Sequence, residues 1–516
     1  MPGDALVGID IGTTHTKGVL VGTAGQVHGE ASRESDLISD HPSWAEMDPE
    51  QWWANTCEIA ADLVARAVEL DLNVAAVGIS GMVPALVMLD DAGAPVRRSI
   101  QQNDARTAHE IEAVATIIAP ERFFELSGGS INQQVMAPKL RWLMRHEPEA
   151  LGRARLLLGS YDYVRFRLTG TKGVEHNWAL ESGLANVHTG VWDPELMAAA
   201  GIDERLLPAI HPSHAVVGTV TAEAARATGL PEGTPVVAGI ADHVASAFAA
   251  GVTGDGDLLI KFGGAGDILY STRELVTDAR LFIDYHVVPG RYLLNGCMAT
   301  SGSMLKWLVR EFFEADAATA RSNGTDVFAF LDARASQHPP GSQSIVVLPY
   351  FLGEKTPIHD PHARGTIVGL GLHHDRYALY RAFLEAVVFG FAHHVEVLRE
   401  RGLEVRRVLA SDGGARSDVW LQIAADVLAV PVHRVGRHPG SSLGAAFVAG
   451  KAVGAIDTWD AIEQYTEVLA PFEPQAEASR IYQQAFGVYR ETYERLKSLY
   501  PALGRIAEPS LNGGNA

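Results

Sequence analysis

The sequence predicts an α/β protein built from two large domains of related architecture. The chain has 516 residues, which is too long for one ordinary hydrophobic core. Strand-like and helix-like segments occur together in both halves, as in an α/β fold. A strand–glycine turn–strand unit near the N-terminus returns about half a chain later, which indicates a duplicated architecture.

The first of these units lies at the start of the chain. The apolar strand 5–9 is followed by the turn 10–14 and a second strand at 16–21, which predicts a hairpin. The segment 48–51, Asp-Pro-Glu-Gln, forms a capping box with proline at the first helical position, and it predicts a helix through Glu69. The uncharged run 74–89 contains glycine and proline and is shorter than the ~20 residues of a membrane helix, so it predicts strand–turn–strand.

The second unit comprises a strand at 257–262, a glycine turn at 263–266 and a strand at 267–270. Glycines in the segment just before it predict a domain boundary, with an N-terminal domain at 1–252 and a C-terminal domain at 253–503. Aromatic residues spaced by three and four between 482 and 500 predict a helix face that packs on the core. We expect the short, polar segment 504–516 to be a flexible tail.

Composition narrows the classes of partner and compartment. The formal net charge of −20 and the absence of a basic run argue against nucleic-acid binding. The only cysteines, Cys57 and Cys297, fit reduced residues of a cytosolic protein, and the N-terminus does not resemble a secretory signal. Neither a Walker P-loop nor the usual zinc-binding spacings occur in the sequence.

Two aspartates stand where strands end. Asp10 precedes a turn of Gly12, Thr13 and Thr14, so its carboxylate could hold Mg²⁺ through water while turn amides and hydroxyls face a phosphate. On its own, this turn fits a solvated hairpin equally well. Asp242 follows an apolar strand and a glycine at the start of a helix, which suits either a helix N-cap or a carboxylate that faces a cleft.

Two glycine turns in the second half could approach a nucleotide. Gly263 and Gly264 form a flexible turn that can come close to phosphate. The segment 413–415, Gly-Gly-Ala, lies between an apolar strand and a predicted helix, where a flat base or ribose can lie against the backbone. Taken alone, either turn is also compatible with a purely structural role.

The order and spacing of these motifs resemble the FGGY family of carbohydrate kinases over about residues 7–500. The segments that carry the resemblance are 10–14, 238–242, 263–266, 351–357, 364–370 and 413–415. Within the family, the segments 80–81, 103–107, 137–142, 146–149 and 161–170 are most similar to xylulokinases.

The resemblance implies an actin-like ATPase fold of two RNase H-like domains flanking an ATP/sugar cleft. It implies transfer of the γ-phosphate of ATP to a sugar hydroxyl, with Mg²⁺ near Asp10 and Asp242 as general base. The same resemblance implies that the ATP phosphates face two turns, one with Gly12, Thr13 and Thr14 and one with Gly263 and Gly264. It also implies that the adenosine lies on Gly413, Gly414 and Ala415. D-Xylulose, giving D-xylulose 5-phosphate, is the best single substrate expectation; another ketopentose, a polyol or a sugar acid stays open.

The sequence departs from the family mainly where the sugar is expected. Xylulokinases carry Gln-Met-His-Gly after Ser80-Gly81, whereas this chain has Met-Val-Pro-Ala, so polar contacts to sugar hydroxyls are lost. The expected substrate contacts are Met82, Val83, Gln102, Asn103, Asp104 and Gln134, with Asn177 as a further candidate. The second phosphate turn usually has Gly-Thr-Ser, and here the hydroxyls are replaced by Gly264 and Ala265.

Two other functions use the same residues differently. An actin-like ATPase or chaperone would use the nucleotide to switch shape, but the segments between 137 and 170 favour a sugar kinase. A degenerate kinase could act as a sugar sensor, but both Asp10 and Asp242 are present. The expected partners are a small sugar and ATP, without nucleic acid or membrane, and a homodimer is one of the assemblies considered.

Overall fold

The computed structural model describes residues 3–436 and 440–507, which fall into two compact units. The first unit contains the described residues of Met1–Thr253, Arg273–Leu293 and Arg437–Glu467. The second contains those of Gly254–Thr272, Leu294–Gly436 and Val468–Ala516. Residues 273–293 and 440–467, assigned to the C-terminal half from sequence, therefore cluster with the first unit.

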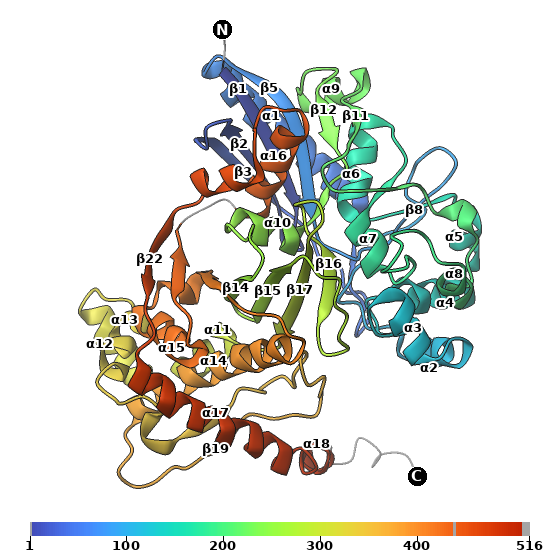
Figure 1. Ribbon diagram of the computed structural model, residues 1–516. Coiled ribbons are helices and arrows are strands. Elements are labelled where there is room, and N and C mark those ends of the chain that lie inside the picture. The colour runs from blue at the N-terminus through green and yellow to red at the C-terminus, as the bar shows by residue number, and fades with distance from the viewer. Residues whose placement is uncertain (1–2, 437–439, 508–516) are drawn as a thin grey trace. The chain divides into compact units, whose positions relative to one another are not determined.

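The first unit is built around a mixed sheet whose centre is β1 and β5 (Figure 1). β1, β2 and β3 pair antiparallel, β5 and β12 run parallel to β1, and β11 closes the far edge antiparallel to β12. In order across the sheet, the strands are β11 (Val216–Thr219), β12 (Pro235–Val237), β5 (Leu72–Gly81), β1 (Gly3–Ile11), β2 (His15–Gly22) and β3 (Val27–Glu34), and β13 (Ile240–Ala241) also pairs with β5. The expected first hairpin is thus confirmed.

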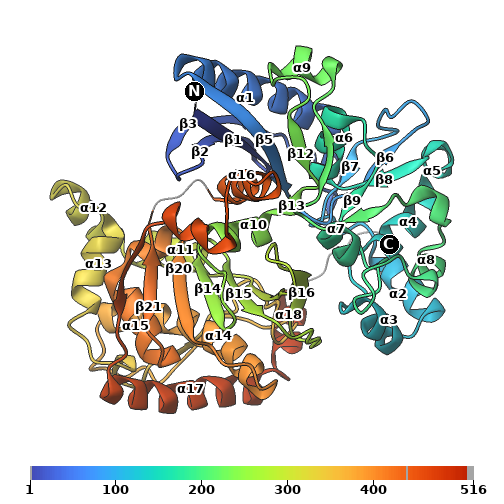
Figure 2. The same ribbon diagram turned by 45° about the horizontal axis from the view of Figure 1, so that its top comes forward.

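Two helices cover the opposite faces of this sheet, α1 (Pro49–Glu69) and α16 (Ser441–Ala452) (Figure 2). Helix α16 lies directly on the backbone of the central strands because two strand residues have no side chain. A Cβ atom at Gly8 would lie 1.9 Å from the Ser442 carbonyl oxygen, and one at Gly78 would lie 2.0 Å from the Ala445 carbonyl oxygen. The glycines are therefore what permits this contact.

Helix α1 begins and ends where the sequence predicts. The side chain of Asp48, the N-cap residue, accepts a hydrogen bond from the backbone N–H of Glu50 at 3.0 Å. Pro49 occupies the first helical position, where its missing N–H costs nothing. The apolar residues of one face, among them Trp52, Ile59 and Leu63, are buried against the sheet.

Shorter elements complete the first unit around this central layer. The run 74–89 forms the end of β5 and a separate short strand, which confirms the expected strand–turn–strand. The helices are α2 (Ala108–Ile117), α3 (Pro120–Ser127), α4 (Met136–His146), α5 (Pro148–Arg153), α6 (Ser160–Thr169), α7 (His176–Glu181), α8 (Pro194–Ala200), α9 (Ala222–Thr228) and α10 (Asp242–Ala249). The small strands are β4 (Glu46–Met47), β6 (Val87–Leu89), β7 (Ser99–Ile100), β8 (Leu156–Leu158), β9 (Val174–Glu175), β10 (Ile210–His211) and β16 (Phe282–Tyr285).

The second unit repeats the strand order of the first. Its sheet contains β17 (Tyr292–Met298), β15 (Gly266–Thr272), β14 (Asp257–Phe262), β20 (Arg407–Ser411), β21 (Val432–Val435) and β22 (Val468–Phe472). β14 forms an antiparallel hairpin with β15, and β20 runs parallel to β14. This matches the first unit, where β5 runs parallel to β1. β21 is parallel to β20, and β22 is antiparallel to β21. The duplication expected from the two hairpins is therefore confirmed.

The described residues of the second unit form seven α-helices. They are α11 (Gly302–Phe312), α12 (Glu314–Ser322), α13 (Val327–Ala335), α14 (Arg376–Glu400), α15 (Asp418–Leu428), α17 (Ala476–Leu496) and α18 (Tyr500–Ala507), and β18 (Val346–Leu348) pairs with β19 (Thr366–Val368). Helices α14 and α15 pack on the sheet, and α13 and α17 pack on these two helices. Within the described ranges, no helix combines the length and the apolar character that crossing a membrane requires.

The aromatic face near the C-terminus packs on the core, as the spacing predicts. Tyr482 and Tyr489 of α17 are fully buried. The hydroxyl of Tyr482 donates to Glu385 at 2.9 Å and accepts from Arg381 at 2.7 Å, and both partners lie on α14. Residues 504–507, the start of the expected tail, belong to α18, and 508–516 lie outside the described residues.

We expect Gly78→Ala to lower the free energy of unfolding by about 1–3 kcal/mol, because the new methyl group would force α16 off the sheet. Urea denaturation of the purified variant measures this change. Gly152→Ala in α5 is the matched control, since a Cβ atom there has no neighbour within 4 Å and alanine favours a helix. Equal urea midpoints for Gly78→Ala and the wild type would contradict the close packing.

Candidate functional site

Three strands of the first unit end side by side at one edge of the sheet. β1 and β13 lie on either side of β5 and both run parallel to it, so that Asp10 and Ile240 pair with the same residue, Ser80. One position later, Ile11 and Ala241 both pair with Gly81. The residues that follow, Gly12, Met82 and Asp242, therefore emerge together at the carboxyl end of the sheet, where ligands of open α/β sheets bind.

Asp10 is held by two hydroxyl groups. The Ser80 hydroxyl donates to Oδ1 of Asp10 at 2.8 Å, and the Ser441 side chain at the start of α16 also hydrogen-bonds the carboxylate. Burial, and next the negative charge of Asp242, raise the pKa of Asp10 from 3.8 to about 6. Because the carboxylates of Asp10 and Asp242 repel each other, binding of a cation beside them would be electrostatically favourable.

The turn after Asp10 is tight. The backbone N–H of Gly12 donates to the His15 carbonyl oxygen at 3.1 Å, and a Cβ atom at Gly12 would lie 2.8 Å from that same oxygen. A side chain is therefore excluded at this position. The Thr13 hydroxyl lies 3.9 Å from the Met82 sulfur, and Thr14 is exposed.

Asp242 is the first residue of α10, and Ala241 occupies the N-cap position, so Asp242 is not the helix cap that the sequence also allowed. Its Oδ1 accepts the backbone N–H of His243 at 2.6 Å. The side chain is 40% exposed, which leaves the carboxylate accessible to a substrate.

The segment 82–85, where sugar contacts were expected, is fixed through its carbonyl oxygens. The oxygen of Met82 accepts from the Ser160 hydroxyl at 2.8 Å, and that of Ala85 accepts from the Trp178 indole N–H at 2.8 Å. The oxygen of Pro84 accepts from Nζ of Lys139 at 3.4 Å. The side chains of Met82 and Val83 are nearly buried, so the segment has a rigid backbone and an apolar surface.

Lys139 joins this segment to a second expected contact. Its Nζ also donates to the Gln134 carbonyl oxygen at 2.9 Å, so the two segments lie next to each other. Burial lowers the pKa of Lys139 to about 7. Lys139 lies in the segment 137–142, which resembles xylulokinases, and no local pattern in the sequence indicated that it links these two segments.

The other expected sugar contacts differ in what they touch. Asp104 is buried, and its carboxylate accepts from the Ala45 backbone N–H at 2.6 Å and from the Arg106 guanidinium at 2.7 Å, so it stabilises its own loop. Asn103 is exposed. The Gln102 Oε1 atom is buried and has no hydrogen-bond partner within the described residues. A contact of these residues with sugar stays a prediction.

Asn177 is fully buried and pairs with a backbone segment. Its amide donates to the Tyr285 carbonyl oxygen at 2.9 Å and accepts the Tyr285 N–H at 2.7 Å. Beside it, the side chains of Glu181, His243 and Asp284 offer one oxygen or nitrogen atom each within 4.8 Å of one another. The sequence analysis did not identify this group, because only His243 is adjacent to a predicted site residue.

The second unit contains a cavity of about 660 Å³, a size typical of small-molecule sites. Because β14 and β20 are paired neighbours, the turns that follow them emerge at one edge, and Gly263, Gly264, Gly413 and Gly414 all line the cavity. Ala415 is buried just behind. The structure thus brings the two predicted glycine turns of this unit together.

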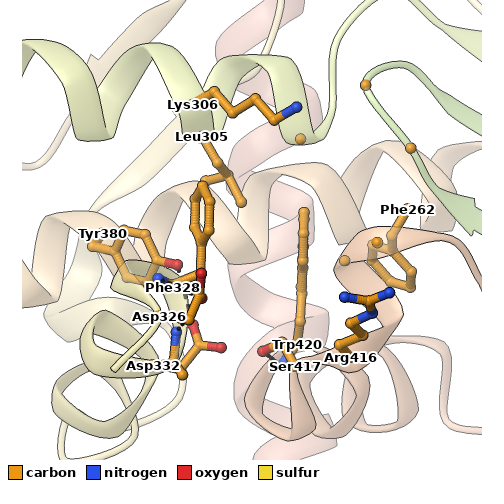
Figure 3. A pocket seen from close by; sticks show the side chains of 16 residues that line it. Phe262, Leu305, Lys306, Asp326, Phe328, Asp332, Tyr380, Arg416, Ser417 and Trp420 are labelled. Carbon is orange, nitrogen blue, oxygen red and sulfur yellow. Dashed lines mark hydrogen bonds between the residues drawn. The ribbon is translucent and has the colours of Figure 1, made fainter. Parts of the chain in front are cut away.

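Aromatic rings form much of the remaining wall (Figure 3). The rings of Phe262 and Trp420 lie 4.6 Å apart, and the Trp420 indole N–H donates to the Leu384 carbonyl oxygen at 2.9 Å, which fixes the ring. A Cβ atom at Gly414 would lie 2.5 Å from Trp420 and 2.7 Å from Phe262, so glycine keeps the floor of the cavity flat. Lys306 extends over the cavity from α11.

Comparison with known proteins agrees with this arrangement. The model of the N-terminal domain of the FGGY family of carbohydrate kinases matches residues 5–249, and that of its C-terminal domain matches residues 268–453. A xylulose kinase of Staphylococcus epidermidis is 30% identical over 499 residues, covering 96% of this chain and 98% of the relative. A gluconokinase of Bacillus licheniformis is 26% identical, covering 96% of each chain.

A solved structure shows the same fold. The crystal structure of a xylulose kinase from Rhodospirillum rubrum matches with a TM-score of 0.90 and 44% identity, covering 96% of this chain and 99% of that one. Together with the repeated sheet, this match confirms the two-domain, actin-like ATPase fold. The chain belongs to the FGGY family of carbohydrate kinases and is an ATP-dependent sugar phosphotransferase.

Proposed function

We propose that the protein transfers the γ-phosphate of ATP to D-xylulose and forms D-xylulose 5-phosphate. The observation that carries the proposal is the placement of Asp10 and Asp242 at one sheet edge, beside a turn that excludes a side chain at Gly12. The identity of the sugar rests on the xylulose kinases among the similar proteins.

In this proposal Asp242 is the general base. Its Oδ1 accepts the His243 N–H, so Oδ2 is the atom that takes the proton from the sugar hydroxyl. Proton removal matters most as the new O–P bond forms, and a carboxylate within hydrogen-bond reach of the hydroxyl is suited to this step. The exposure of the Asp242 side chain leaves room for such a contact.

Asp10 is the residue we assign to Mg²⁺. Its carboxylate oxygens are ligands of the type that Mg²⁺ prefers, and burial and the nearby charge of Asp242 both raise the pKa of Asp10, so a cation beside the carboxylate would be electrostatically favourable. When bound, Mg²⁺ would neutralise negative charge on the ATP phosphates. Hydrogen bonds from Ser80 and Ser441 hold the Asp10 carboxylate, and they would keep it in place when it binds such an ion.

We assign the adenosine to the cavity of the second unit. Gly413, Gly414 and Ala415 form a flat floor for the base or ribose, and the fixed Trp420 ring adds apolar surface. Backbone amides at Gly263 and Gly264 face the phosphates from the neighbouring turn. In the first unit, Thr13 and Thr14 have the same role through amides and hydroxyls.

For the sugar, the proposed contacts are Met82, Val83, Gln102, Asn103 and Gln134. The unpaired Oε1 of Gln102 is the most specific of them, because a buried acceptor without a partner favours a ligand hydroxyl. A sugar acid is the second candidate substrate, since a gluconokinase is among the relatives. The first unit also offers Lys139 and Arg106, but protein carbonyls and carboxylates already hold both.

We expect Mg²⁺-ATP turnover with D-xylulose to exceed turnover with other ketopentoses, xylitol and D-gluconate by at least about tenfold, the discrimination that placed hydrogen bonds supply. Coupled ADP release measures the rates, and addition of EDTA should abolish them. Preference for D-gluconate would favour the sugar acid, and binding of ATP without turnover on any sugar would contradict a kinase.

We expect Asp242→Asn to lower kcat by about 10²- to 10⁴-fold, because the amide cannot accept the hydroxyl proton. The KM for ATP should stay within about threefold, since the nucleotide is assigned to other residues. Steady-state kinetics measure both constants. Near-normal turnover of the variant would remove Asp242 from the role of base.

We expect Gly264→Thr to lower the KM for ATP by about two- to tenfold, the value of one added hydrogen bond. A Cβ atom at Gly264 has no neighbour within 4 Å, so the hydroxyl found in related turns fits without strain. Gly264→Val is the matched control, since it has the same shape without the hydroxyl. An equal KM for both variants would show that the hydroxyl makes no contact with ATP.

A further inference from the structure

Three side chains of the first unit form a compact group beside Asp242, which we call the His243 cluster: Glu181 of α7, His243 of α10 and Asp284 of β16. Nε2 of His243 lies 2.9 Å from Oδ2 of Asp284 and 3.9 Å from Oε1 of Glu181. Nδ1, on the other side of the same ring, lies 3.4 Å from Oδ1 of Asp242. The imidazole therefore stands between the proposed base and a second carboxylate.

The Asp284 end of this arrangement is anchored. Asp284 is only 1% exposed, so it has no access to a substrate. The next residue, Tyr285, is paired through both its N–H and its carbonyl oxygen with the buried amide of Asn177. The ring of Tyr285 also stacks on His176, with centroids 4.5 Å apart. The backbone that carries Asp284 is thus fixed by the helix that ends in Glu181.

The charges favour an imidazolium at the centre. Burial alone would lower the pKa of His243, but the charge of Asp284 and the hydrogen bonds to Asp242 and Asp284 outweigh it and raise that pKa well above 6.5. Burial, and next the charge of Asp284, raise the pKa of the Glu181 carboxyl well above 4.5. The cluster can therefore hold one positive charge directly beside Asp242.

We propose that His243, fixed by Asp284, is a positioning residue that orients the Asp242 carboxylate for proton transfer. This proposal rests on the role of Asp242 as general base. The backbone N–H and the ring of His243 approach the same oxygen, Oδ1 of Asp242, from one residue. They fix the rotation of the carboxylate, and Oδ2 is left to face the sugar hydroxyl.

The test is a double-mutant cycle of His243→Gln and Asp284→Asn, with kcat and both KM values measured. Each single variant should lower kcat by about 10- to 100-fold, because small misplacements of a reacting group are costly. The KM values for sugar and ATP should stay within about threefold. The double variant should be no slower than the slower single variant, since both residues act through one contact.

Thermal unfolding of the same proteins separates positioning from a purely structural role. Each single variant leaves one partner of a buried ion pair without the other and should lower Tm, whereas the double variant removes both charges and should recover much of that loss. If the cluster only holds the fold together, kcat returns with Tm in the double variant, and the proposal is wrong. Recovery of Tm with kcat still low supports it.

His214→Gln is the matched control within the same unit. The His214 ring packs edge-on to Trp459 with centroids 6.0 Å apart, and it belongs to neither the cluster nor the sugar segment. Its kcat should equal that of the wild type.

The Asp242→Asn variant separates the general-base role of Asp242 from the positioning role of His243. If this variant stays active, Asp242 is not the base and both roles are ruled out. If it is inactive while Asp284→Asn has normal kcat, only the positioning role fails.

Discussion

The close contact between α16 and the two central strands of the first unit is the constraint on which its functional edge depends. Gly8 and Gly78 are paired neighbours, and a Cβ atom at either would collide with a carbonyl oxygen of α16. Two residues further along, Asp10 and Ser80 are paired in the same register. The same pairing of β1 with β5 therefore allows α16 to pack closely and sets the position of the Asp10 carboxylate. Ser441, at the start of α16, then hydrogen-bonds Asp10.

Much of this arrangement follows from local sequence. Apolar strands that end in glycine turns predicted both hairpins, and the capping box predicted the start of α1. Asp10 and Asp242 were found because each follows an apolar run that predicts a buried strand. In the structure Asp10 is the last residue but one of β1 and Asp242 directly follows β13, so both lie at the same sheet edge. The glycine turns at 263–266 and 413–415 were identified for the same reason, and they do line one cavity. Assigning roles to them required the family resemblance.

Other parts depend on contacts between distant segments, which local patterns do not reveal. Asp104 looked like a polar residue near a sugar, but Arg106 and the Ala45 N–H occupy its carboxylate. Likewise, the side-chain amide of Asn177 hydrogen-bonds the backbone of Tyr285, 108 positions away. The partner of His243 is Asp284, 41 positions later, on a strand that clusters with the first unit although it follows the start of the second. Only the folded chain shows these pairings.

The two units show how one sheet design serves two chemical tasks. In each, a hairpin is joined by a parallel strand, and the residues proposed to contact a ligand lie at the carboxyl ends of neighbouring strands or in the turns that follow them. In the first unit those positions hold carboxylates, hydroxyls and a histidine, which suit proton and cation chemistry. In the second they hold glycines backed by aromatic rings, which suit a flat, largely apolar ligand. The backbone geometry sets where a ligand can lie, and the side chains at the same few positions determine which chemistry takes place there.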